Sequence, residues 1–167
     1  MSGLKNQLTK RTTRWTLIGV TTGVVVVAAI IGYNVWANHS VVERQFIHEA
    51  EFPIYAPRSA PKGFTVEKGQ TQLNGEVLSY VLINQATNKQ ITVTVQPKPG
   101  NFDMSQMTKG GSVESVTVQL GILYNLSAGG STRFLLNTGD TLIFMTSPES
   151  VDTETVTNLA NSLTRFN

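Results

Sequence analysis

The feature that most constrains this chain is an uncharged apolar segment close to its N-terminus. Residues 15–38 contain no charged side chain, and their middle is a run of valine, alanine and isoleucine. The hydrocarbon core of a bilayer is about 30 Å thick, which about 20 helical residues can cross. In lipid the backbone has to satisfy its own hydrogen bonds, so even a valine-rich segment becomes helical there. Residues 15–37 are therefore predicted to form a transmembrane helix, with the lipid bilayer as its partner.

The charges and aromatic residues around this segment predict its orientation. Four basic residues and no acidic residue precede Trp15, whereas all eleven carboxylates follow the segment. Basic residues favour the cytoplasmic side, and aromatic rings such as Trp15, Tyr33 and Trp36 favour the two interfaces of a bilayer. The sequence thus predicts a cell-membrane protein with a cytoplasmic tail at residues 1–14 and an extracellular C-terminal domain.

A cleaved signal peptide is the alternative interpretation of the same segment. Val35 and Ala37 are suitable residues for the −3 and −1 positions of a cleavage site after Ala37. The apolar core of a signal peptide usually has about 7 to 15 residues, and this run is longer, which favours an uncleaved anchor. Under the alternative, the remainder of the chain is a secreted domain.

Composition argues against several classes of function. The chain has no cysteine, which removes disulfides, thiolate metal sites and a cysteine nucleophile. Its formal net charge of +2 comes from the N-terminal tail, because nine Lys and Arg against eleven carboxylates leave the rest at −2. Nucleic-acid binding requires a basic patch on the folded domain, so we expect no nucleic-acid partner.

Residues 38–50 are predicted to form a stalk between the apolar segment and the outer domain. Their apolar residues neither alternate nor fall on one helical face. Both histidines of the chain, His39 and His48, lie in this stretch, nine residues apart and without a second ligand type at metal spacing. We therefore expect no metal and no cofactor here.

The remaining residues, 51–167, are predicted to form a β-rich domain. Three prolines between Pro53 and Pro61 favour an ordered, extended opening segment. The apolar residues around these prolines are expected in the core: Phe52, Ile54, Tyr55 and Phe64. Segments of β-forming residues, several with period-two alternation, then predict an antiparallel sheet of about six strands. Their ranges are 65–72, 77–83, 91–95, 115–126 with a bend at Gly121, 132–136 and 141–146.

The C-terminal residues predict a helix of about 13 residues. Pro148 ends the last strand, and Ser150 or Asp152 can cap the helix start. A single apolar stripe follows at i, i+3, i+4 and i+7: Val156, Leu159, Ala160 and Leu163. Such a short helix is unstable alone in water, so it is expected on the sheet. The predicted fold class is α+β, an N-terminal transmembrane helix followed by an antiparallel sheet with a C-terminal helix packed on one face.

Two motifs of the outer domain resemble those of a known family. Phe52-Pro53-Ile54-Tyr55, with the prolines and Gly63-Phe64 that follow, resembles the opening of an uncharacterised extracytoplasmic domain. Residues 141–145 and 156–163 are similar to its closing strand and helix. The family follows the single transmembrane helix of bacterial anti-sigma-factor-like and sporulation-associated membrane proteins. The resemblance covers about residues 51–165 and implies this fold and a tethered topology.

One departure from that family concerns the cytoplasmic part. Its anti-sigma members hold the sigma factor with a cytoplasmic domain, whereas fourteen residues precede the apolar segment here. A tail of that length cannot fold into such a module, so any signalling must pass through a partner in the membrane. The resemblance therefore implies a fold and a topology and no activity.

No constellation of residues predicts catalysis. No serine stands in a Gly-x-Ser-x-Gly motif, and Gly110-Gly111 and Gly129-Gly130 lack the signature of a phosphate loop, so both are expected in turns that need φ above zero. Several carboxylates fall near predicted strand ends, where they solubilise a sheet: Glu67, Glu76, Asp103, Glu114 and Asp140. The sequence thus predicts a non-enzyme without a catalytic, cofactor-binding or metal site.

Two classes of function fit this organisation. An anchor, a stalk and a small sheet without catalytic groups favour a tethered extracytoplasmic binding or sensory domain, with an envelope or membrane protein as a possible partner. The alternative is a structural or assembly factor of the cell envelope. Gly19 and Gly23 have the small-xxx-small spacing that lets two membrane helices approach each other, which is compatible with the alternative.

Overall fold

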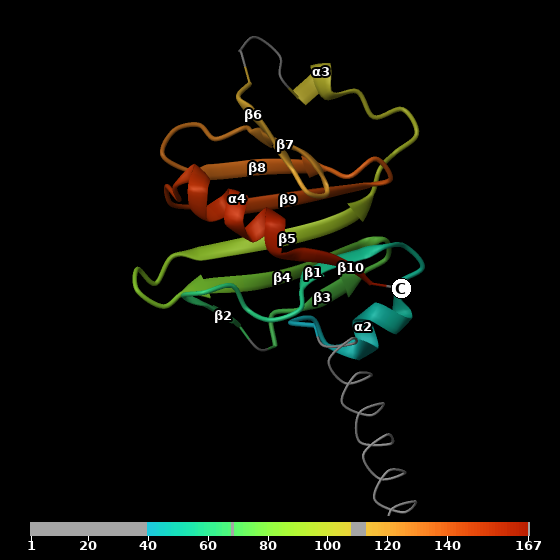
Figure 1. Ribbon diagram of the computed structural model, residues 1–167. Helices are drawn as coiled ribbons and strands as arrows, with labels where there is room; N and C mark the ends of the chain where they lie inside the picture. Colours follow the sequence, from blue (N-terminus) through green and yellow to red (C-terminus); the bar gives the residue numbers. More distant parts are fainter. Residues whose placement is uncertain (1–39, 68, 108–112, 167) are drawn as a thin grey trace, which may run out of the picture. The chain divides into compact units, whose positions relative to one another are not determined.

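The computed structural model describes residues 40–67, 69–107 and 113–166 (Figure 1). The elements follow one another as α2 (Arg44–Glu49), β1 (Ile54–Pro57), β2 (Phe64–Val66), β3 (Gln72–Asn74), β4 (Val77–Asn84), β5 (Gln90–Pro97), α3 (Met104–Met107), β6 (Ser115–Val118), β7 (Gly121–Asn125), β8 (Thr132–Asn137), β9 (Thr141–Ser147), α4 (Thr153–Ser162) and β10 (Leu163–Phe166). The described part is mostly β-sheet with a C-terminal helix on it, which confirms the predicted fold class in outline.

Several predictions lie outside the described residues. These are the cytoplasmic tail at 1–14, the membrane span at 15–37, and the turn at Gly110-Gly111. Within residues 40–67, 69–107 and 113–166, no helix combines the length and apolar character that crossing a membrane requires.

The larger sheet is antiparallel, and its strand order differs from the chain order. From one edge to the other the strands run β2, β4, β5, β9, β8, β7 and β6, and β3 shares the outer edge of β4 with β2. A long crossover carries the chain from β5 through α3 to the far edge (Figure 1). From there β6 to β9 return strand by strand, so that β9 pairs with β5.

One face of this sheet forms the core. Across four neighbouring strands, Tyr80 opposes Val93, Val93 opposes Met145, and Met145 opposes Phe134. Each of these side chains is at most 2% exposed. Figure 1 shows α4 crossing the sheet, and the helix buries three residues of the predicted apolar stripe: Val156, Leu159 and Ala160. Every second side chain of the strands therefore packs against the apolar stripe of the helix, whose residues recur every 3.6 positions.

A two-stranded ribbon of β1 and β10 forms the second sheet and was not predicted. The C-terminal helix ends at Ser162 after ten residues, and Leu163 starts a strand that pairs antiparallel with β1. The Tyr80 hydroxyl donates a hydrogen bond to the backbone oxygen of Tyr55 at 3.3 Å, which holds β1 over the core face. The prediction of about six strands in one sheet was therefore wrong in number. The described residues form ten strands in two sheets, and five of these strands have only three or four residues: β1, β2, β3, β6 and β10.

The residues predicted to form the stalk differ from a free linker. Ser40 begins the compact unit to which the described residues belong. Val42 is 1% exposed in the core, and the backbone N–H of Val41 donates to the Pro57 oxygen at 3.0 Å. Residues 44–49 form α2, which packs Phe46 and Ile47 against the core. The four residues predicted to hold the opening segment in the core are all buried: Phe52, Ile54, Tyr55 and Phe64.

The chain reverses at Gly121 where a bend had been expected within one strand. Val118 pairs with Gly121 and closes a hairpin of β6 and β7 with a two-residue turn. A Cβ at Gly121 would lie 2.1 Å from the backbone oxygen of Asn137 on β8. Glycine therefore permits β7 to approach β8 at this point.

Candidate functional site

A polar pocket of about 420 Å³ lies between two loops of the described domain. One wall is the end of β7 and the loop to β8, within residues 125–134, and the other is the start of α4, within residues 150–153. Its volume falls in the range of about 300–1,000 Å³ that small-molecule sites occupy. We take this pocket as the candidate functional site.

The first wall is shaped by a glycine turn. Gly129 and Gly130 have φ values of +62° and +82°, as the sequence predicted for a turn. The Ser131 hydroxyl donates a hydrogen bond to the Ala128 oxygen at 2.8 Å, across the bridge that closes the turn. The absence of side chains at the two glycines leaves the backbone accessible along this wall.

A buried threonine ties the first wall to the second. Thr132 is 3% exposed, and its hydroxyl donates a hydrogen bond to the Glu149 oxygen at 2.8 Å. The same hydroxyl accepts one from the N–H of Val151 at 2.6 Å. Phe134 and Val151 add apolar surface to the lining. The separation of the two loops is therefore fixed by hydrogen bonds and not only by apolar contact.

The second wall is formed by the start of α4, and it carries Asp152, the only acidic residue of the pocket lining. Asp152 caps the helix, because its carboxylate accepts hydrogen bonds from the Thr155 N–H at 2.7 Å and the Thr155 hydroxyl at 2.8 Å. These bonds, with the positive charge of Lys89, hold the pKa of Asp152 below its ordinary value. The carboxylate is therefore ionised at neutral pH. Of the two capping candidates in the sequence, Asp152 is the cap, whereas Ser150 lines the pocket.

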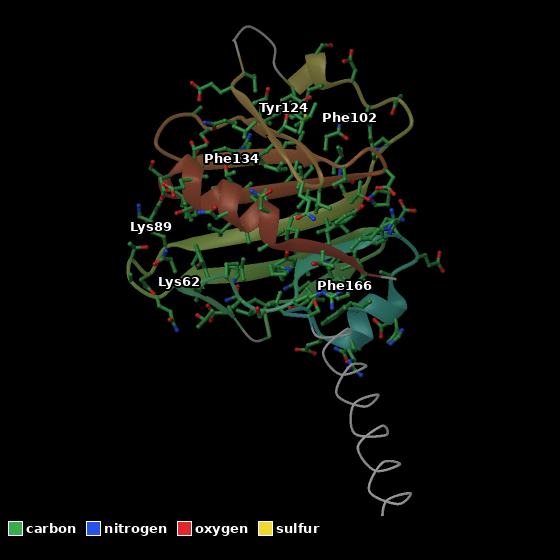
Figure 2. The ribbon with its side chains drawn as sticks, in the orientation of Figure 1. Lys62, Lys89, Phe102, Tyr124, Phe134 and Phe166 are labelled. Carbon is green, nitrogen blue, oxygen red and sulfur yellow. The ribbon has the colours of Figure 1, made fainter. Side chains whose placement is uncertain are left out.

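Lys89, on the β4–β5 hairpin, contacts the residues of the second wall. Its ammonium donates a hydrogen bond to the Ser150 oxygen at 2.5 Å. Figure 2 labels Lys89 near the end of the β4–β5 hairpin, where α4 begins. A smaller cavity of about 60 Å³ separates this hairpin from the helix, and it shares Val151 and Asp152 with the pocket. The loop before α4 is thus held between two hairpins of the sheet.

The groups that line the pocket favour a neutral, hydroxyl-bearing ligand. Five hydroxyl groups, one amide and one carboxylate line it, and no Lys or Arg does. The hydroxyls of Ser150 and Thr153 make no hydrogen bond to another described residue, which leaves them available to a ligand. An anion would meet the charge of Asp152 without a facing cation. A saccharide would meet donors, acceptors and a small apolar surface from Val151.

A second polar cluster surrounds Asp140 and has a structural role. Its carboxylate accepts hydrogen bonds from the hydroxyls of Thr141 at 3.0 Å, Thr138 at 3.1 Å and Tyr55 at 3.4 Å, and pairs with Arg165 at 3.1 Å. Desolvation acts to raise the pKa of Asp140, but the hydroxyl bonds and the Arg165 charge together lower it. The cluster joins the β8–β9 turn to both strands of the β1–β10 ribbon.

The carboxylates singled out in the sequence are dispersed over the domain, and only Asp140 lies in such a cluster. In the part of the chain that the structure describes, no group of three or more His, Asp or Glu side chains is placed to hold a metal ion. His48 is exposed on α2. The pocket was missed by the sequence analysis because its walls are about 20 residues apart and its lining consists of common Ser, Thr and Gly residues.

Comparisons with known protein families, with curated proteins and with solved structures find no match for this chain. The resemblance of residues 51–165 to an extracytoplasmic domain family therefore stays a prediction. The site has to be interpreted from its own geometry.

Proposed function

We propose that this chain is a membrane-tethered extracytoplasmic binding domain, and that the pocket between the β7–β8 loop and α4 is its binding site. The observation that carries the proposal is the pocket itself: about 420 Å³ in volume, with a lining of hydroxyl groups and backbone that includes no basic side chain. The ligand class that fits this chemistry is a neutral saccharide, free or as part of an envelope glycan.

The tether is the second part of the proposal and is supported by the sequence. Residues 15–37 are uncharged, and the four basic residues before them favour a cytoplasmic N-terminus. Anchored in the cell membrane in this way, the domain would have its pocket on the extracytoplasmic side. We infer no catalytic activity from the site.

Ligand titration of the full chain tests the binding site. The probes are a panel of neutral mono- and disaccharides, with inorganic phosphate as the anionic comparison, followed by saturation-transfer NMR. Thr153→Trp places a large side chain at the pocket wall, whereas Asn158→Trp places it at an exposed position farther along the same helix. We expect a saccharide signal that Thr153→Trp reduces at least tenfold and Asn158→Trp leaves unchanged.

Two outcomes would contradict the proposed site. If no saccharide gives a signal, the ligand class is wrong. If both tryptophan variants bind as the native chain does, binding occurs elsewhere.

A topology experiment tests the tether. A C-terminal epitope on the full chain should be removed by protease added to intact cells, while a product of about the full 18.2 kDa mass fractionates with membranes before digestion. A product that starts near residue 38 and appears in the medium would instead show cleavage of a signal peptide. An epitope that stays protected in intact cells would contradict the extracytoplasmic location.

A further inference from the structure

The outer edge of β6 has the features of an unprotected strand. β6 ends the larger sheet: it pairs with β7 on one side, and no described strand pairs with its other side. Its residues are Ser-Val-Thr-Val, all uncharged. Among the described residues, three large apolar side chains are exposed, and two of them lie on this hairpin, Val116 at 43% and Ile122 at 42%. The third, Met107, ends α3 in the crossover that leads to β6.

The backbone directions along β6 follow from one hydrogen bond. The Asn125 N–H donates to the Glu114 oxygen at 2.9 Å, so the polar backbone groups of Glu114 point toward β7. In an antiparallel pair these directions alternate along the strand. The backbone N–H and C=O groups of Ser115 and Thr117 therefore point away from β7, whereas those of Val116 point toward β7. The free edge offers two donors and two acceptors to an added strand.

We propose that this edge binds the same edge of a second copy of the chain, as an antiparallel pair with Val116 opposite Val116. A two-fold axis normal to the sheet leaves the core face of both copies on the same side of the joined sheet. Residues that oppose each other must therefore both have even numbers or both have odd numbers. With Val116 on the axis, Ser115 of each copy opposes Thr117 of the other. All four outward backbone groups of each copy are then used, in four hydrogen bonds across the interface.

The side chains are compatible with this register. The central pair is Val116 with Val116, and the flanking pairs are Ser115 with Thr117. Pairs of β-branched residues and hydroxyl pairs across strands are both stabilising, by roughly 0.2–1 kcal/mol each. The two larger sheets would join into one continuous sheet, and the exposed Val116 would become buried.

A neighbouring register is disfavoured by α4. A shift that places Thr117 on the axis would require Gln119 to pair with Ser115 of the second copy. The Gln119 N–H already donates to the side-chain oxygen of Asn161 on α4, at 3.2 Å. The backbone groups of β6 that are available for pairing thus end before Gln119. The register centred on Val116 uses those of both Ser115 and Thr117.

Charge favours a second copy as the occupant. Glu114 is the only charged residue between positions 114 and 120. In the proposed register it lies opposite Val118 of the second copy, and the two Glu114 carboxylates stand about 14 Å apart, at a rise of about 3.4 Å per residue. That distance exceeds the Debye length of about 8 Å at physiological ionic strength. The edge therefore pairs with itself without opposing like charges.

Disulfide trapping tests the pairing, because the native chain has no cysteine. In the full chain, Val116→Cys places two sulfhydryls on a non-hydrogen-bonded pair, where the Cα atoms lie about 4.5 Å apart and a disulfide can form. Ile122→Cys is the matched control, with nearly equal exposure but one strand further in, so that its two copies are about 16 Å apart. Under mild oxidation we expect at least tenfold more covalent dimer from Val116→Cys. Equal yields from the two variants, or none from either, would overturn the proposal.

Sedimentation of the full chain in mild detergent separates this contact from association through other segments. Val116→Lys places two ammonium groups opposite each other, whereas Thr65→Lys adds the same charge at an exposed position of β2 on the other edge. We expect Val116→Lys to lower self-association at least tenfold and Thr65→Lys to leave it unchanged. A native chain that stays monomeric up to about 100 μM, or a dimer that Val116→Lys does not weaken, would contradict pairing through β6.

Discussion

The two edges of the larger sheet differ in how they end. At one edge, β4 is eight residues long but its outer side is shared by β2 and β3, each of three residues. The chain leaves the sheet between them, in a loop that contains Glu67 and Gly69. At the other edge, β6 runs without interruption or charge, and its outward groups face no described strand.

This difference indicates that edge protection is selective in this domain. Proteins commonly protect edge strands by making them short, irregular or charged, because an open edge pairs with other chains. The β2–β3 edge is divided between two three-residue strands with Glu67 between them, whereas β6 is also short, at four residues, but is continuous and uncharged and has exposed apolar side chains beside it. A domain that protects one edge and leaves the other open is suited to pairing through the open one.

The largest expected effect concerns the glycines that shape the two edges. Gly121→Ala places a Cβ 2.1 Å from the Asn137 oxygen, so the β6–β7 hairpin has to shift away from β8. We expect a loss of about 3 kcal/mol in the free energy of unfolding. Gly75→Ala, in the turn between β3 and β4 at φ +58° with no atom within 4 Å, should lose about 1 kcal/mol.

Chemical denaturation of the native chain and both glycine variants measures these losses. Equal losses would show that the close approach of the β6 hairpin to β8 does not matter for stability.

Acidification is expected to destabilise the domain through two of its carboxylates. Hydrogen bonds hold the pKa values of Asp140 and Asp152 below the ordinary Asp value, which is about 3.9. Each carboxylate therefore contributes stability that is present above about pH 4 and is lost as the pH falls through its lower folded value. Thermal melts between pH 6 and pH 2.5 should show a fall in Tm below about pH 4. The double variant Asp140→Asn with Asp152→Asn should show a smaller fall, and an unchanged profile would contradict this assignment.

Removal of the helix cap should affect one edge more than the other. Asp152→Ala deletes the two hydrogen bonds to Thr155, which we expect to lower stability by about 1 kcal/mol. The helix contacts β1, β6 and β7, so amide hydrogen exchange should accelerate in those strands and stay unchanged where β3 pairs with β4, at the end of β4 that is remote from the helix start. Uniform acceleration across the sheet would show that α4 does not support the β6 side selectively. Thr157→Ala on the same helix provides the control.

Local patterns predicted part of this fold well, and their failures have a common physical reason. The β4–β5 hairpin, the Asp152 cap and the burial of Ile54 follow from neighbouring residues, and each agrees with the structure. The β1–β10 ribbon depends on two segments about 110 residues apart, each too short to show a strand pattern alone. The pocket likewise arises where two distant loops meet, and the free edge of β6 is evident only once the strand order is known.

The smallest expected effect concerns the end of the β6 edge. Asn161→Leu removes the acceptor for the Gln119 N–H, at a cost of about 0.5–1 kcal/mol in stability. It also frees that donor for the alternative register centred on Thr117. In this background, disulfide trapping should decrease for Val116→Cys and increase for Thr117→Cys. Unchanged yields would show that Asn161 has no part in choosing the register.

The central claim is that the β6 edge is an interaction surface and the β2–β3 edge is not. Residue-resolved amide hydrogen exchange of the full chain, at low and high protein concentration, tests this claim most directly. In the free chain, the N–H groups of Ser115 and Thr117 point away from β7 and should exchange rapidly. We predict that raising the concentration from about 1 to 100 μM slows their exchange at least tenfold, while exchange in β2 and β3 stays unchanged. Rates at Ser115 and Thr117 that do not depend on concentration would contradict the account.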